Sequence, residues 1–347
     1  MRTVRRSEVA FETPLEHLLE PLTPNDAFFV RNHARAVPRI DAAAYRLSVA
    51  GARGSRDVTL AGLRALPRVA ATITLACSGN GRTAFDPRPS GVPWSFGAIG
   101  TARWEGVRLR DVLALAGIGE EDAHVVLDAY DDAPPDGRPP FRRSIPLARA
   151  LHDATIVADT MNGEPLAPEH GGPARLLVAG WTANHAVKWL RRIALSPRPD
   201  EGWWMTEDYR VPGPSGAMEI IEAAAPVAIL ASPRTGATLA PDVLLQGIAY
   251  GEPPPQHVRI DIQPADAAPI DRTDAHHADV RYDDGPYAWG RWSLRLTLTP
   301  GPHRLVIRPL DADGNPGPER GTPNPKGYLY NGPHTVQITI NPAPMSS

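Results

Sequence analysis

Apolar side chains follow two different patterns along the chain, and the pattern changes near Pro226. Before that point, local patterns predict three short helices, over residues 60–66, 109–116 and 146–151. Apolar runs over 155–158 and 175–178 predict strands on either side of the turn signal Asn162-Gly163. The first part of the chain therefore mixes helices and strands.

After Pro226, strand-like apolar runs are separated by Pro, Gly and Asp. These runs cover residues 227–230, 243–250, 258–262, 293–298, 305–308 and 335–340. Short strands at regular spacing are typical of an antiparallel sandwich. The proline- and glycine-rich segment 211–216 separates the two patterns, so we predict two domains, over residues 1–215 and 216–347.

The composition agrees with many short elements, because 39 prolines and 30 glycines are spread over 347 residues. A net charge of −3 argues against a general nucleic-acid binder, so any anion must be bound locally. The first 20 residues lack the apolar region of a signal peptide, and no run is long enough to span a bilayer. We therefore expect a soluble, cytoplasmic protein with no membrane partner.

Cys77 is the only cysteine, and it ends an apolar run that breaks into Ser78-Gly79-Asn80-Gly81-Arg82. A strand followed by two glycines leads into a tight turn, which exposes the last side chain of the strand to a ligand. The nearby positive charge of Arg82 favours a thiolate, the form of cysteine that attacks substrates or binds metal. The alternative is that Cys77 is a buried small hydrophobic residue, which is the commoner fate of a lone cysteine.

Two other motifs resemble binding sites, but the residues around them argue against that function. Residues 79–84 fit a glycine-rich dinucleotide pattern, but the prolines at 87, 89 and 93 are incompatible with the helix that this motif must open. His276 and His277 are adjacent, so on a strand they face opposite sides and cannot easily bind one metal together.

A series of segments around Cys77 resembles, in order along the chain, the molybdenum domain of the sulfite oxidase family. The segments are 28–33, 45–51, 74–80, 94–99, 102–107, 109–113, 144–147, 161–166, 170–171 and 187–190. The resemblance covers roughly residues 22 to 340. It implies an α+β molybdopterin-binding sulfite oxidase fold followed by an all-β immunoglobulin-like sandwich, through which members of the family form homodimers.

The resemblance assigns chemistry to individual residues. It implies that the Cys77 thiolate binds molybdenum beside the dithiolene sulfurs of a pyranopterin, molybdopterin. Arg31 and Arg82 match the two active-site arginines of the family, and Lys326 stands where the C-terminal domain contributes a third cation. Lysine keeps the charge there but lacks the paired donors of arginine.

Further residues match the cofactor-binding positions of the family. They are Asn32, His33, Asp131, His170, Arg175 and Lys188. Ala186 occupies the place of another family histidine, so His185, one position earlier, is the candidate for that role. The cationic side chains would offset the phosphate charge of the cofactor, and histidine and aspartate can bind the pterin edge.

Asp159 is the main departure from the pattern of the family that the sequence resembles, because sulfite oxidases place an active-site tyrosine at this position. Ionised, the aspartate would repel a dianionic product, whereas a protonated aspartate could donate a hydrogen bond as the tyrosine does. We therefore expect Asp159 to belong to the catalytic set and to alter the substrate preference.

The function that the resemblance implies is oxidation of sulfite, or a related small oxyanion, to sulfate. No haem-binding Cys-x-x-Cys-His motif is present and no cytochrome-like extension precedes residue 22, so we expect a separate electron acceptor, a cytochrome or another carrier. One alternative is a different oxo transfer at the same molybdenum site, such as reduction of nitrate or of an S- or N-oxide. A second alternative is a binding or scaffold protein without a cofactor.

Overall fold

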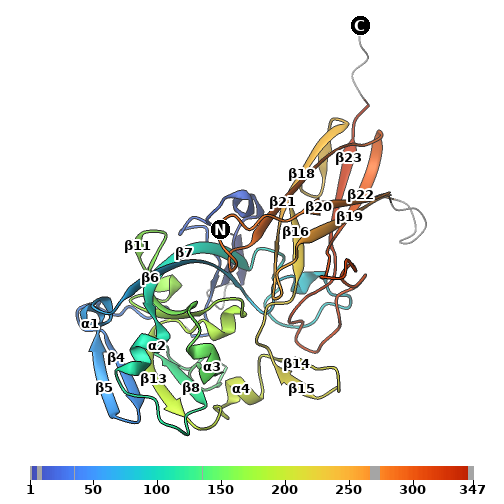
Figure 1. The fold of residues 1–347 in the computed structure, drawn as a ribbon. Helices are drawn as coiled ribbons and strands as arrows, with labels where there is room; N and C mark the ends of the chain where they lie inside the picture. The colour runs from blue at the N-terminus through green and yellow to red at the C-terminus, as the bar shows by residue number, and fades with distance from the viewer. Residues whose placement is uncertain (1, 6–9, 35, 135, 266–273, 343–347) are drawn as a thin grey trace.

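The computed structural model describes residues 2–5, 10–34, 36–134, 136–265 and 274–342. Figure 1 shows two bodies side by side, one built from the blue to yellow-green segments and one from the orange to red segments. Strands dominate both, and the helices are short. Among the described residues, no helix combines the length and the apolar character needed to cross a membrane.

The sheet that carries Cys77 is antiparallel throughout. Its order is β11 (Glu164–Pro165), β10 (Thr155–Met161), β7 (Ile99–Arg108) and β6 (Arg68–Ala76), and β12 (Arg175–Val178) also pairs with β10. Cys77 follows the last residue of β6, so the strand delivers it to the edge of the sheet. The two strands predicted beside the Asn162-Gly163 turn are present as β10 and β12, and both turn residues have positive φ.

A second sheet lies beside the first. Its order is β5 (Gly54–Thr59), β4 (Arg46–Gly51), β13 (Leu190–Ser196), β8 (His124–Ala129) and β9 (Arg142–Pro146). The predicted helices are present as α1 (Leu60–Arg64), α2 (Leu109–Ala114) and α3 (Leu147–Ala150). One apolar core joins both sheets to α1 and α2, because Leu47, Leu109 and Val157 belong to the same buried cluster. Burial of such side chains from water is the main force that holds the layers together.

Short elements complete the first body. They are β1 (Arg2–Arg5), β2 (Ala10–Glu12), β3 (Val30–Arg31), α4 (Trp203–Thr206) and the 3-10 turns η1 (Leu15–Leu19), η2 (Arg82–Ala84), η3 (Pro168–His170) and η4 (Ala183–His185). The hairpin of β14 (Arg210–Pro212) and β15 (Met218–Ile220) follows. The predicted domain boundary at residues 215 and 216 falls between these two strands.

The second body consists of two sheets packed face to face. One has the order β16 (Val227–Ser232), β18 (Asp242–Tyr250), β21 (Gly290–Thr297), and the other β17 (Ala237–Leu239), β23 (His334–Ile340), β22 (Gly301–Pro309), β19 (His257–Pro264), β20 (Asp274–Asp279). Leu245, Ile260, Trp292 and Leu305 belong to the core between them. All six predicted strands are present, and β23 alternates strictly between buried and exposed residues.

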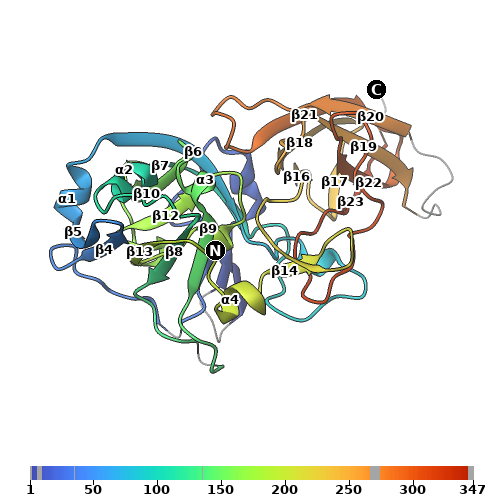
Figure 2. The same ribbon diagram turned by 60° about the horizontal axis from the view of Figure 1, so that its bottom comes forward.

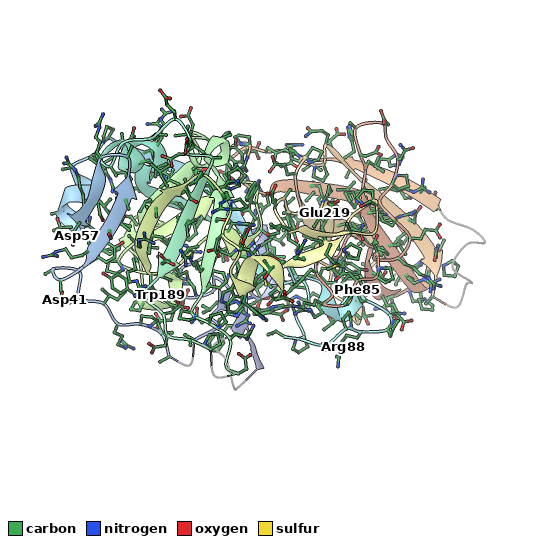
Figure 3. The ribbon with its side chains drawn as sticks, turned by 90° about the horizontal axis from the view of Figure 1, so that it is seen from below. Asp41, Asp57, Phe85, Arg88, Trp189 and Glu219 are labelled. Carbon is green, nitrogen blue, oxygen red and sulfur yellow. The ribbon has the colours of Figure 1, made fainter. Side chains whose placement is uncertain are left out.

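The segment after Cys77 connects the two bodies. In Figures 1 and 2 the cyan chain after β6 extends from the first body toward the second, and Figure 3 labels Phe85 there. Phe85 and Phe96 share one buried cluster with Ile229, Ile248 and Tyr330 of the second body. The loop that follows Cys77 is therefore held in place from both sides.

Candidate active site

Cys77 lies where two cavities meet. Its backbone N–H donates to the Ala98 carbonyl (2.9 Å), and its carbonyl accepts from the Asn80 N–H (2.9 Å). Gly81 adopts the left-handed conformation, with a φ of 80°, which turns the chain directly after the cysteine. The side chain is partly exposed and lines both cavities, so Cys77 is accessible to a ligand in each.

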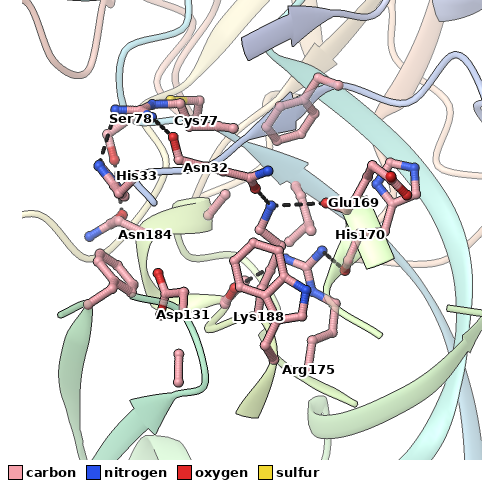
Figure 4. Close-up of a pocket in the computed structure, with 18 of the residues that line it drawn as sticks. Asn32, His33, Cys77, Ser78, Asp131, Glu169, His170, Arg175, Asn184 and Lys188 are labelled. Carbon is pink, nitrogen blue, oxygen red and sulfur yellow. Dashed lines mark hydrogen bonds between the residues drawn. The ribbon is translucent and has the colours of Figure 1, made fainter. Parts of the chain in front are cut away.

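The first cavity, which we call the inner cavity, is lined by apolar rings and by polar side chains (Figure 4). Six of the predicted cofactor-binding residues line it: Asn32, His33, Asp131, His170, Arg175 and Lys188. They come from separate strands and loops, so only the folded chain brings them together. The sequence analysis did not identify Asn184, Ser78 or Glu169, which line the same cavity.

Several buried polar atoms around the inner cavity have no hydrogen-bond partner among the residues that the structure describes. They are Nδ2 of Asn32, Nδ2 of Asn184, Oδ1 of Asp131 and Nε of Arg175. A buried polar group without a hydrogen bond costs about 1–3 kcal/mol, so such groups gather where a bound molecule completes them. Both donors and an acceptor are available, as the polar edge of a pterin requires.

The inner cavity is also rich in buried positive charge. Arg175 donates to the carbonyls of His170 (2.8 Å) and Ala186 (3.1 Å), and burial lowers its pKa to about 9. Burial and the neighbouring Arg175 hold the pKa of Lys188 well below its usual range. Burial raises the pKa of Asp131, the nearby carboxyl group, to about 6. An anionic group bound here would favour the charged forms of both Arg175 and Lys188.

The second cavity, which we call the outer chamber, opens on the other side of Cys77. Charged residues dominate its wall: Arg31, Arg82, Arg138, Lys326, Asp136 and Asp208. Burial and the nearby Arg31 hold the pKa of His33 well below its usual range, so this histidine is neutral. Four cations against two carboxylates leave an excess of two positive charges, which favours a small anion.

Arg82 is held rigidly in the wall of the outer chamber. Its Nε donates to the Lys326 carbonyl (2.9 Å), and its Nη1 donates to the Val92 carbonyl (2.8 Å). A Cβ atom on Gly79 would lie 2.5 Å from Arg82 Nη2, so only glycine leaves room for the guanidinium. The side chain of Lys326 donates to Asp208 Oδ1 (2.8 Å), which fixes the cation that the second body contributes.

Tyr209 is a candidate site residue that the sequence analysis did not identify. It lines both cavities, and its hydroxyl lies 2.7 Å from His33 Nε2. Arg31 Nη2, which can only donate, lies 3.1 Å from His33 Nδ1. The proton of neutral His33 must then sit on Nε2 and point at the tyrosine oxygen. The Tyr209 hydroxyl is left to donate its own proton to a ligand.

The structure contradicts the prediction that Asp159 belongs to this site. Asp159 lines neither cavity, and its carboxylate accepts hydrogen bonds from Arg64 Nε (2.8 Å) and Arg68 Nη2 (2.7 Å). Burial would raise the pKa of Asp159, but the bonds from Arg68 and Arg64 outweigh it and lower the pKa. The pairing of β10 with β7 shifts register between Ala158 and Thr160, around this residue. Asp159 therefore does not stand in the place of a tyrosine at the cavity wall, whereas Tyr209 lines both cavities.

His185 is also not a lining residue of either cavity. It ends the short turn η4, which places Asn184 and Ala186 at the inner cavity. The buried His185 ring instead lies against Trp181, with ring centroids 4.7 Å apart, and its Nε2 lies 2.7 Å from the Ile221 carbonyl. The prediction that His185 contacts the cofactor is wrong for this geometric reason.

Comparison with known proteins gives the same picture as the geometry. The family model described as "Oxidoreductase molybdopterin binding domain" matches residues 33–204. Mitochondrial sulfite oxidase of Homo sapiens is 33% identical over 353 residues, covering 95% of this chain and 64% of that protein. Sulfite oxidase of Gallus gallus is 35% identical over 340 residues, covering 92% of this chain and 73% of that protein.

Two further matches are more distant. Nitrate reductase of Hordeum vulgare is 28% identical over 365 residues, covering 95% of this chain and 40% of that protein. The crystal structure of the sulfane dehydrogenase SoxCD from Paracoccus pantotrophus superimposes with a TM-score of 0.79 at 23% identity. That match covers 98% of this chain and 89% of the other, and it shows a shared fold.

The fold and the inner cavity define a molybdopterin-binding oxidoreductase. Within that class, the chain belongs to the sulfite oxidase family. Its cofactor is molybdenum–molybdopterin, and the unpartnered polar atoms and buried cations of the inner cavity fit such a group. The chain spans 64% of the length of the human relative.

Proposed function

We propose that the protein oxidises sulfite to sulfate and passes the electrons to a separate one-electron acceptor. The observation that carries this proposal is the position of Cys77 between a cavity suited to the cofactor and a chamber suited to a small anion. The bound cofactor would supply oxygen-atom transfer and two-electron redox chemistry. Cys77 lines both cavities, so its thiolate would be the ligand that the protein contributes to the metal.

The residues of the outer chamber would bind and orient the substrate. Arg31 and Arg82 can each hold two oxygens of an oxyanion through paired N–H groups, and Lys326 adds a third charge. Burial raises the pKa of Tyr209, so its phenol stays protonated and can donate a hydrogen bond to an anionic oxygen. These groups stand in fixed positions before the substrate arrives, which is what electrostatic stabilisation of a reaction requires.

The alternatives receive less support. Reduction of nitrate remains a second candidate because a nitrate reductase is among the relatives. The reason for expecting an unusual substrate was Asp159, and that residue lies outside the site. A scaffold protein without a cofactor would have no use for the unpartnered polar atoms buried around the inner cavity.

We also propose that the two sheets of the second body form the immunoglobulin-like sandwich of the family, as a domain over residues 216–347 after the molybdopterin-binding domain 1–215. This domain would join two copies of the chain in a homodimer. Size-exclusion chromatography with light scattering tests the assembly, and a mass of 37.4 kDa, that of a single chain, would contradict it.

The decisive experiment measures reduction of ferricyanide by sulfite with molybdenum-loaded protein, and Cys77→Ser as the control. We expect turnover that is lost in the control, because serine does not replace a thiolate ligand. Loaded protein without sulfite turnover would refute the proposal, and reduction of nitrate by the same protein with a viologen donor would establish the second candidate. Full activity of Cys77→Ser would contradict the role of the thiolate.

A further inference from the structure

Arg143 is a buried cation without a carboxylate partner. It lies on β9 with none of its surface exposed, and within the described ranges it forms no ion pair. Its Nη1 donates to the Trp204 carbonyl, its Nη2 lies 3.2 Å from His185 Nε2, and its Nε has no hydrogen-bond partner in the described part of the chain. Burial lowers its pKa to about 10, so it still carries a charge at neutral pH. Burying a charge without a counterion is costly, so buried charges of this kind are found preferentially at functional sites.

The guanidinium lies over the ring of Tyr209, with Cζ 5.4 Å from the ring centroid. A cation over an aromatic face attracts the ring electrons and restrains the ring. The same ring stacks on Tyr328 at 5.3 Å, while its hydroxyl lies beside His33. Arg143 therefore places a positive charge directly against the face of the Tyr209 ring.

Arg143 also connects the segments that lead into both cavities. Trp204, whose carbonyl it binds, lies in α4, five residues before Tyr209. His185, on its other side, directly follows Asn184 of the inner cavity. The Arg143 side chain therefore connects the segment that leads to Tyr209 with the segment that forms part of the wall of the inner cavity.

We propose that Arg143 is the positioning residue of Tyr209: its guanidinium fixes the ring and polarises the phenol, so that the hydroxyl is directed into the outer chamber. The inference rests on the proposed function, because Tyr209 would act there on the sulfur oxyanion. Arg143 itself lines neither cavity, and it acts through Tyr209.

The kinetic test compares Arg143→Met, Arg143→Lys and the matched control Arg142→Met in molybdenum-loaded protein. Arg142 is the neighbouring residue on β9, but its side chain is 43% exposed and pairs with Asp128 and Asp200. We expect kcat/KM for sulfite to fall about tenfold in Arg143→Met, to recover in part in Arg143→Lys, and to stay within about twofold in the control. Equal effects of all three variants would overturn the proposal.

A double-mutant cycle shows whether Arg143 acts through the hydroxyl. In a Tyr209→Phe background, Arg143→Met should have little further effect on kcat/KM, because the group that Arg143 positions is already absent. Independent effects that multiply would show that Arg143 does something else, and would refute the inference.

A spectroscopic measurement makes the test independent of turnover. Tyrosine labelled with ¹³C at Cζ gives at most eight signals in this chain, and the signal that Tyr209→Phe removes belongs to Tyr209. In oxidised, loaded protein, Arg143→Met should shift that signal and Arg142→Met should not. An unchanged Tyr209 signal overturns the proposal.

Absence of sulfite turnover in the unmodified protein would refute the proposed function, and the Tyr209 signal would still decide the role of Arg143. If Arg143→Met does not fold, Arg143→Gln, which keeps a long polar side chain and removes the charge, decides by the same two readouts.

Discussion

Tyr209 combines a buried ring with a left-handed backbone, with a φ of 51°. This conformation costs a residue other than glycine roughly 1–2 kcal/mol, so its neighbours must stabilise it. Asp208 Oδ1 accepts a hydrogen bond from the Tyr209 N–H, and the Tyr209 carbonyl accepts one from Ile221, each at 2.9 Å. The unfavourable backbone conformation of Tyr209 lowers local stability, and it positions the Tyr209 hydroxyl at the two cavities.

Replacing Tyr209 with Phe removes only that hydroxyl. We expect kcat/KM for sulfite to fall by about tenfold or more, because one hydrogen bond to an anionic oxygen is lost in a buried chamber. The free energy of unfolding should fall by about 1–3 kcal/mol, since the ring contacts remain but the buried His33 Nε2–H loses its acceptor. Steady-state kinetics and thermal unfolding check the two parts, and unchanged kcat and KM would exclude a role for the hydroxyl.

Asp159→Asn should act on stability and leave catalysis unchanged. The variant weakens the bonds from Arg64 and Arg68, whose side chains are 47% and 36% exposed, so the expected loss is about 1 kcal/mol. Folding lowers the pKa of Asp159. Its contribution to the free energy of unfolding is therefore complete above the ordinary pKa of 3.8, and it is lost as the pH falls through the lower pKa of the folded state.

Denaturant unfolding of both proteins between pH 3 and pH 7 checks the Asp159 prediction. The difference between them should be largest near neutral pH and should shrink toward pH 3. An altered KM for sulfite in Asp159→Asn would instead return this residue to the active site.

Ten of the twelve residues predicted for the site line the two cavities, because they stand in short motifs whose order along the chain can be compared. The sequence analysis failed at Asp159 and Tyr209 for a physical reason. A register shift around Asp159 affects which way its side chain points, and Tyr209, between α4 and β14, is brought to the cavities beside Cys77 only by the packing of the folded chain. Neither event leaves a local pattern in the sequence.

At the scale of elements, the loop after β6 decides the position of Arg82. Gly79→Ala would place a Cβ atom 2.5 Å from Arg82 Nη2, although Arg82 is tied to the carbonyls of Lys326 and Val92. We expect the guanidinium to shift and KM for sulfite to rise about three- to tenfold, since bidentate binding depends on geometry. Gly317→Ala, where the nearest atom is 3.5 Å away, is the control, and equal kinetics of the two variants would contradict this account.

The strands of the second body were predictable because their apolar and polar residues alternate between Pro and Gly turns. The strands β17 and β20 were not predicted. Both lie at the edges of their sheet, and β20 consists mainly of polar or small residues. An edge strand buries little of either face, so the alternation that identifies a strand is weak there.

At the scale of the molecule, the two bodies share a polar anchor as well as an apolar cluster. Asn80 Nδ2 donates to the Tyr250 hydroxyl (2.9 Å), and the Leu329 N–H donates to the Ser78 carbonyl (2.7 Å). Tyr250→Phe leaves the buried Asn80 amide without its acceptor, so we expect a loss of about 1–3 kcal/mol.

The Tyr250→Phe prediction is checked by denaturant unfolding followed by tryptophan fluorescence and by circular dichroism. Both probes should report one shared transition, at a lower midpoint than in the unmodified protein, because the cluster that contains Phe85 and Ile248 spans both bodies. Two separate transitions would show that the bodies unfold independently.

The two cavities differ in which parts of the chain build them. Every residue that lines the inner cavity lies between positions 28 and 209, whereas Lys326 and Tyr328 of the outer chamber come from the second body. Exchange of the short segment around Lys326 could therefore change which anions enter while leaving cofactor insertion as it is. In evolution, a family with this arrangement can acquire new substrates through one peripheral loop without rebuilding its metal centre.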